Sequence, residues 1–106
     1  MKSVKVHKHA AKEIQKLSLH MKMRLAELFD LLAHGESLGL PVSRPMPSIE
    51  NGVHELRIKD SSGQYRVFYY TKLRNEILVF HFFRKKTQTT PKKELDVAKK
   101  RLKELL

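Results

Sequence analysis

The chain contains no cysteine and no tryptophan, and it has only four glycines and four prolines in 106 residues. The lack of cysteine excludes a disulfide framework and Cys-ligated zinc, and it fits a reducing compartment. No hydrophobic run reaches the roughly 20 residues of a membrane-spanning helix, and the N-terminal segment has no apolar core for export. We therefore expect a cytoplasmic protein that forms one domain, residues 1–106.

Acidic residues are also scarce, since 11 Asp and Glu face 22 Lys and Arg, for a formal net charge of +11. Such an excess in a small domain indicates a polyanionic partner, above all a nucleic acid, or an acidic protein that neutralises it. A merely solubilising surface is the simpler alternative. Hydrophobic residues make up 41% of the chain, which favours a globular fold over disorder.

Three strands are predicted in the second half of the chain. His54–Lys59 alternates between apolar and polar residues, Tyr65–Thr71 is rich in aromatic and β-branched residues, and Glu76–Phe83 is almost continuously apolar. The last pattern is typical of a strand buried on both faces. Gly63 supplies the turn between the first two strands.

The first half predicts a short strand at Ser3–His7 and two helices, the second capped by Ser18 and ended by Gly35. We expect these helices to form an antiparallel hairpin on one face of the sheet. The proline-containing segment Glu36–Gly52 is a connector, expected along the surface. Thr90-Pro91 marks the start of a last helix, with Thr90 as its cap. The order predicts an α+β fold with helices mainly on one face.

Three segments of the sheet region carry a family resemblance: Glu55-Leu56-Arg57, Tyr65–Tyr69 (YRVFY), and Phe83–Pro91 (FRKKTQTTP). In order and spacing they resemble the RelE/ParE superfamily of type II toxins, and within it the phage-related, HigB-like branch. The resemblance implies a RelE-like fold, with an N-terminal strand and helical hairpin on a mainly antiparallel sheet and a C-terminal helix. It also implies a toxin that cleaves mRNA at the ribosome, without a metal or other cofactor, and a tightly bound antitoxin. The antitoxin gene often lies adjacent and encodes a helix-turn-helix protein.

In such toxins the ribose 2′-OH attacks the neighbouring phosphate, which requires a base, an acid and stabilisation of the extra negative charge. Arg57 and Arg66 are the candidates for charge stabilisation, because guanidinium groups offer a rigid fork of donors and lie here on strands. Solvated strand residues, or partners of Glu55, are the alternative interpretation. Lys85 or Lys86 is the candidate acid or base, with Lys86 preferred, because neighbouring cations favour loss of the proton. A rim that only holds phosphate is equally compatible.

The sequence offers further candidates for RNA binding and for proton transfer. Tyr65 and Tyr70 could stack on bases, although core positions are more typical of strand aromatics. His81 and His54 could transfer protons, but their apolar surroundings favour structural roles. Glu55, where some ribosome-dependent relatives carry a basic residue, is either a base or a salt-bridge partner. The remaining residues expected at the RNA are Lys59, Arg84 and Thr87.

Two rival functions remain open. ParE-like relatives share the fold but poison DNA gyrase, so the fold does not decide the target. A basic module that binds RNA without cleaving it is the third possibility. No metal site is expected, because His7 and His9 have no further ligands near them in the sequence.

Overall fold

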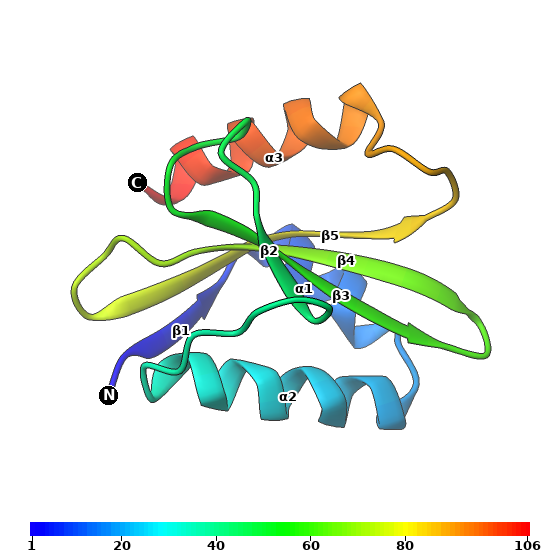
Figure 1. The fold of residues 1–106 in the computed structure, drawn as a ribbon, viewed down its shortest axis with the longest axis horizontal. Coiled ribbons are helices and arrows are strands. Elements are labelled where there is room, and N and C mark those ends of the chain that lie inside the picture. Colours follow the sequence, from blue (N-terminus) through cyan, green and yellow to red (C-terminus); the bar gives the residue numbers. More distant parts are fainter.

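The structure is a computed structural model that describes residues 1–106, with one five-stranded sheet and three helices (Figure 1). The elements follow each other as β1 (Ser3–Val6), α1 (Lys8–Gln15), α2 (Leu19–Ala33), β2 (Ser43–Pro45), β3 (Val53–Asp60), β4 (Gly63–Tyr70), β5 (Glu76–Lys85) and α3 (Lys92–Leu105). The strand order across the sheet is β1-β5-β4-β3-β2. Only the β1–β5 pair is parallel, and the other pairs are antiparallel. The predicted α+β fold is confirmed.

The sheet buries a separate hydrophobic cluster on each face. On one face, α2 contributes Met21, Leu25, Leu28 and Leu32, which pack against strand residues such as Val67. On the opposite face, Ala98 and Leu102 of α3 pack against a second set of strand residues that includes Phe68 and Phe80. α2 and α3 therefore enclose the sheet between them (Figure 1). The prediction of helices mainly on one face overlooked this second layer.

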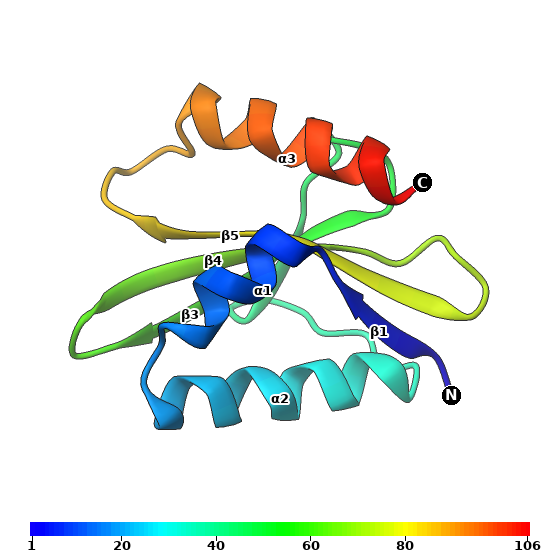
Figure 2. The same cartoon turned by 180° about the vertical axis from the view of Figure 1, so that it is seen from behind.

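The short helix α1 packs against β5 and not along α2 (Figure 2). β1 pairs with β5 only as far as Val79, and the His7 amide donates to the Val79 carbonyl where β1 ends. Ala10 is fully buried, and Ile14 packs at the edge of the α2-side cluster. α1 thus covers the part of β5 that β1 leaves unpaired. The two helices are both present, but they do not pack along each other as the predicted antiparallel hairpin would.

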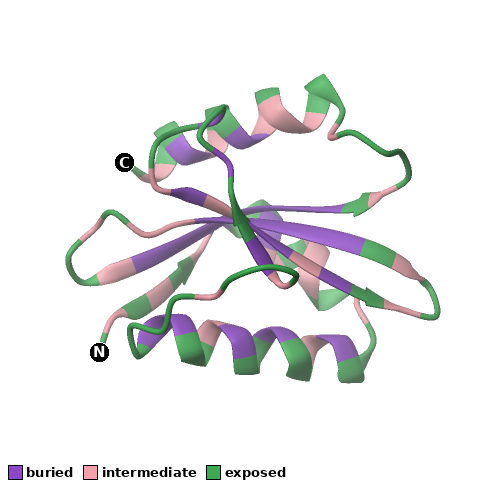
Figure 3. Ribbon diagram, viewed as in Figure 1, coloured by how far each residue is buried: buried purple, intermediate pink, exposed green.

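Strand β5 is the most deeply buried element of the sheet (Figure 3). Every residue from Ile77 to Phe83 is buried, as the continuous apolar run predicted. The register between β4 and β5 shifts at Phe68 and Tyr69, because Phe68 pairs with His81 while Tyr69 pairs with Val79. Phe80 is the extra residue of this β-bulge. Beyond the bulge, the alternation of β5 is reversed, so that residues 81, 83 and 85 take the face that Leu78 and Phe80 occupy before it.

The predicted helix ends are partly confirmed. The Ser18 hydroxyl accepts a hydrogen bond from the Met21 amide at 3.2 Å, and Gly35 has a positive φ of 88° directly after α2. The prediction that Thr90 caps the last helix is wrong. Pro91 is the N-cap residue of α3, and no side chain accepts a hydrogen bond from the first turn.

The connector 36–52 is more than a surface loop. It forms the edge strand β2, which pairs with β3, and it buries Ser43, Met46 and Ile49. The Ser43 hydroxyl lies 2.6 Å from the Tyr69 hydroxyl inside the protein. Most of the segment is exposed, as expected for a surface course, but its buried residues close one edge of the sheet and complete the α3-side cluster. None of the three helices has the length and apolar character that crossing a membrane would require.

Candidate functional site

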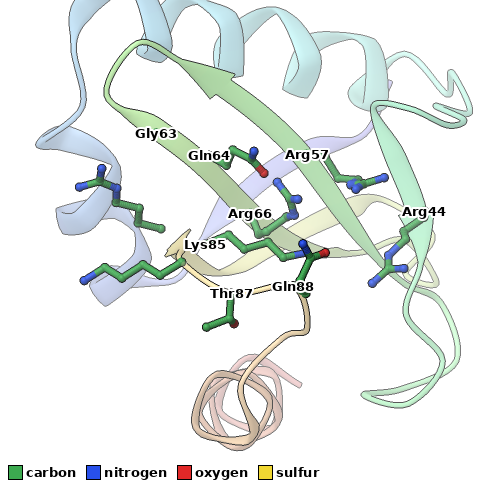
Figure 4. Close-up of a pocket in the computed structure, with 10 residues that line it drawn as sticks. Arg44, Arg57, Gly63, Gln64, Arg66, Lys85, Thr87 and Gln88 are labelled. Atoms are coloured by element: carbon green, nitrogen blue, oxygen red, sulfur yellow. The ribbon is translucent and has the colours of Figure 1, made fainter.

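A large open hollow lies on the α3 side of the sheet (Figure 4). It is located where the turn joins β3 to β4 and where the chain leaves β5. Its volume is about 1030 Å³, and none of its lining residues is hydrophobic. We call it the cationic pocket; its ten lining residues are Arg44, Arg57, Gly63, Gln64, Arg66, Arg84, Lys85, Lys86, Thr87 and Gln88. Six of them are cationic and none is acidic. Such a surface attracts anions, phosphates above all.

The strand register explains why these side chains meet. Arg57 pairs directly with Arg66, and Gln64 pairs with Lys85, so all four side chains leave the same face of the sheet. The two-residue turn between Asp60 and Gly63 fixes this register. The neighbouring guanidinium groups of Arg57 and Arg66 repel each other. A nearby anion is needed to offset this repulsion.

Glu55 is the anion that holds Arg44 and Arg66. Its side chain is fully buried, and its Oε1 accepts a hydrogen bond from Nε of Arg44 at 3.1 Å and lies 3.6 Å from Nε of Arg66. Nη1 of Arg66 also donates to the Tyr65 carbonyl at 3.1 Å. Of the two interpretations of Glu55, the structure shows the salt-bridge partner. Because the carboxylate lies beneath the pocket and not in its lining, the surface offered to a ligand stays wholly cationic.

Two groups of the cationic pocket have shifted proton affinities. Burial lowers the pKa of Arg66, and the neighbouring charges of Arg57 and Arg44 lower it further against the opposing effect of Glu55. Burial also lowers the pKa of Lys85, again helped by the positive charge of Arg66. An arginine stays charged in spite of such a shift, whereas a lysine so placed gives up its proton more readily. Lys85 is therefore the group of this site suited to act as a base.

The β-bulge decides which lysine enters the cationic pocket. Without the extra residue, strict alternation from Leu78 would place residues 84 and 86 on the α3 face, and Lys85 on the other. With it, Lys85 extends from the strand toward Arg66 and Gln88, as Figure 4 shows. Lys86 lies beyond the end of β5, is exposed, and lines both this pocket and a neighbouring hollow. The geometry thus favours Lys85 over Lys86, the reverse of the order preferred from the sequence.

Comparison with protein families adds to this geometry. Residues 12–103 match the family described as phage derived protein Gp49-like (DUF891). The chain belongs to the Gp49-like family. Gp49-like proteins are RelE-like toxins of toxin-antitoxin systems, so a cognate antitoxin is implied as a partner. No curated protein matches the sequence.

In this Gp49-like chain, both tyrosines predicted to stack on bases lie outside the cationic pocket. Tyr65 is buried in the α2-side cluster, where its ring stacks on Phe82 at 5.5 Å between centroids. Tyr70 lies at the far end of β4 and packs at the edge of the α3-side cluster. Neither tyrosine can stack on a base in the cationic pocket. Tyr65 points to the opposite face and lines the neighbouring hollow that Lys86 also lines, and Tyr70 is too far along the strand.

The other expected RNA-binding residues lie in or beside the pocket of this Gp49-like chain. Arg84 and Thr87 line it, and Lys59 lines an adjoining hollow together with Arg57 and Arg66. Arg84 also donates to the Ser62 carbonyl across the β3–β4 turn. A side chain at Gly63 would place its Cβ only 2.6 Å from Nε of Arg84, so the close approach of Arg84 to the turn requires glycine there.

The two histidines are held in structural positions outside the cationic pocket. Nε2 of His81 lies 2.7 Å from Oε1 of Glu94, and Nδ1 lies 3.0 Å from Nη1 of Arg101. Because arginine can only donate, Nδ1 must accept, so the proton of this neutral ring sits on Nε2 and is donated to Glu94. Burial lowers the pKa of His81 in agreement with a neutral ring. His54 stacks on Tyr69, and burial followed by the charge of Lys72 lowers its pKa.

Four lining residues were not singled out as site residues from the sequence: Arg44, Gly63, Gln64 and Gln88. Arg44 stands in the proline-containing segment Glu36–Gly52, which was predicted only as a connector. Gln64 could have been found, since it directly precedes the predicted strand Tyr65–Thr71 and has the parity of Arg66. The structure contains no group of three or more His, Cys, Asp or Glu side chains placed to hold a metal ion.

Proposed function

We propose that this protein is a HigB-like endoribonuclease that cleaves mRNA at the ribosome through the cationic pocket. The observation that supports it is the placement of six cations and no acid around one open hollow. Arg57 and Arg66 are paired on adjacent strands there, and the buried Glu55 holds Arg66 and Arg44. A single RNA strand entering this hollow would be held by its phosphates, which is how sequence-independent binding works.

In the proposed reaction, neutral Lys85 accepts the proton of a ribose 2′-OH. The 2′ oxygen then forms a bond to the adjacent phosphorus, and the bond from phosphorus to the 5′ oxygen breaks. Arg57 and Arg66 donate to the non-bridging oxygens, which carry more negative charge in the transition state than in the substrate. Lys86 or a water molecule returns a proton to the departing 5′ oxygen. The products are a 2′,3′-cyclic phosphate and a free 5′ hydroxyl.

Induction in growing cells tests this function. We expect the wild-type chain to stop growth and to produce new RNA ends in primer extension. Arg57→Ala, Arg66→Ala and Lys85→Ala should each relieve the arrest and remove those ends at matched expression. Lys99→Ala is the matched control, because Lys99 is an exposed cation of α3 outside the pocket, and it should remain toxic.

The rival functions give different outcomes in the same cells. A gyrase poison would induce DNA damage signalling while mRNA stays intact. A binding module without chemistry would bind RNA in a salt-dependent way and yield no cleavage products. Toxicity that survives all three pocket substitutions would show that the cationic pocket is not the site.

The proposed partner is a helix-turn-helix antitoxin encoded next to this gene. With a net charge of +11, the toxin favours an acidic neutralising surface on that partner. Co-purification with the product of the adjacent gene, and relief of growth arrest by its co-expression, would test this. A neighbouring product that neither binds nor neutralises the toxin would contradict it.

A further inference from the structure

A second hollow lies beside the cationic pocket, between α1, the end of β5 and the start of α3. We call it the α1–α3 hollow; its volume is about 670 Å³, and it shares Arg84, Lys86 and Thr87 with the cationic pocket. Segment 86–91 leads from β5 to α3 (Figure 4), and its residues Lys86 and Thr87 line both hollows. A strand of RNA in the cationic pocket would therefore have a neighbouring nucleotide within reach of the second hollow.

The two hollows differ in chemical character. The cationic pocket has no hydrophobic lining residue, whereas the α1–α3 hollow is lined in part by the apolar side chains Leu17, Phe82, Phe83 and Val97. Phosphate and ribose need charge and hydrogen bonds, but a nucleobase also needs an apolar surface against its flat faces. The first hollow suits the RNA backbone and the second suits a base.

The α1–α3 hollow also contains two carboxylates, which the cationic pocket lacks. Oε1 of Glu94 accepts from Nε2 of His81, and Oε1 of Glu13 accepts from Nη1 of Arg101 at 3.0 Å. Both carboxylates are thus held through one oxygen by half-buried or buried partners. Oε2 of each has no hydrogen bond within the chain and is not buried. These oxygens can only accept, so they suit a ligand that presents N–H donors.

From these observations we propose that the α1–α3 hollow holds the base of a nucleotide next to the cleaved phosphate, and that it selects a base with an exocyclic amino group. The inference rests on the proposed function for the position of the RNA. Glu94 accepts a hydrogen bond from the amino group, as acidic side chains do from N4 of cytosine. Arg84 and Lys86, shared between the hollows, hold the phosphate that links the two nucleotides. Uracil, which offers a carbonyl at the corresponding position, is disfavoured.

Binding of uncleavable RNA tests the selection. The probes are 2′-O-methyl trinucleotides of cytosine and of uracil, two pyrimidines that differ in this amino group, titrated onto the purified full chain. Wild type should bind the cytosine probe about tenfold more tightly. Val97→Trp fills the hollow and should abolish the difference. Lys99→Trp is the matched control on the exposed side of α3 and should preserve it.

Glu94→Gln provides a second variant that keeps a hydrogen-bonding side chain opposite His81. Its amide can donate to the uracil carbonyl, so the preference for cytosine should be lost or reversed while overall binding is retained. A purely structural role of Glu94 would weaken both probes equally. Equal affinity of the wild-type protein for the two probes, or an unchanged preference in Val97→Trp, would overturn the inference. If the wild-type chain prefers cytosine but cuts no RNA, the proposed function fails and only the base selection by the hollow stands. If it cuts RNA without this preference, the proposed function stands and the inference fails.

Discussion

At the scale of single residues, the cationic pocket depends on one buried charge. Glu55 is the only acidic side chain among the arginines, and Arg66 is itself nearly fully buried. Removing the carboxylate leaves a buried guanidinium without a counter-charge. We predict that Glu55→Ala lowers the free energy of unfolding by about 3–5 kcal/mol, as for other broken buried ion pairs. Urea unfolding of purified protein measures this.

A double substitution separates stability from function at this position. Replacing both partners, as in Glu55→Leu with Arg66→Leu, leaves no unpaired buried charge and should restore most of the lost stability. The double variant should nevertheless be non-toxic, because Arg66 is missing. A Glu55→Ala protein that unfolds at the wild-type urea concentration would contradict this role of Glu55.

His81 gives a prediction for the pH dependence of stability. Its pKa is lowered in the folded protein by burial, so the unfolded chain binds more protons around its ordinary value of about 6.5. The contribution of His81 is therefore complete above that value and is lost as pH falls below it. We expect the melting temperature to fall between about pH 7 and about pH 5.5, and His81→Gln to reduce this fall. An identical fall in the variant would assign it to other groups.

At the scale of elements, the β-bulge in β5 determines which lysine takes part. It moves Lys85 onto the face of Arg57 and Arg66, where burial and Arg66 lower its pKa. We predict that Lys85→Ala lowers cleavage at least a hundredfold, within the range of general base catalysis, and that Lys86→Ala has a smaller effect. Because only neutral Lys85 accepts a proton, wild-type cleavage should rise with pH until its lowered pKa is passed. Lys85→Arg keeps a positive charge at this position but cannot accept a proton, so this variant should be inactive.

The same comparison of the two lysines can contradict the assignment. If Lys86→Ala abolishes cleavage while Lys85→Ala is active with an unchanged pH profile, the base lies on the segment after β5. The measurement is the rate of RNA cleavage across a pH series for the three proteins.

The bulge also marks the limit of what alternation predicts. The shared face of Arg57 and Arg66 follows from period-two strands joined by a tight turn at Gly63. A bulge at Phe80 has no such signal, since the run Ile77–Phe83 is apolar apart from His81 and fits either register. β2 was missed because three residues that include a proline are too short for a pattern. The position of Arg44 over Glu55 is therefore visible only in the structure.

At the scale of the whole molecule, the excess of cations predicts binding dominated by counterion release. We consider a single RNA strand with about four of its phosphates in contact with the protein. A plot of the logarithm of its binding constant against the logarithm of the salt concentration should then have a slope of about −3. Arg57→Ala should reduce the slope by about 0.7, whereas Lys99→Ala should leave it unchanged. Filter binding at several salt concentrations measures it. A slope unaffected by Arg57→Ala would place the RNA elsewhere.

The central claim is that the cationic pocket promotes attack of a ribose 2′-OH on the adjacent phosphate. The most direct measurement uses programmed ribosomes carrying an mRNA with one mapped cleavage position, compared with the same mRNA bearing a single 2′-deoxy nucleotide there. We predict that the wild-type protein cuts the first mRNA to leave a 2′,3′-cyclic phosphate, does not cut the second at that position, and that Arg66→Ala cuts neither. Cleavage of the deoxy-substituted mRNA at the same bond would contradict the account.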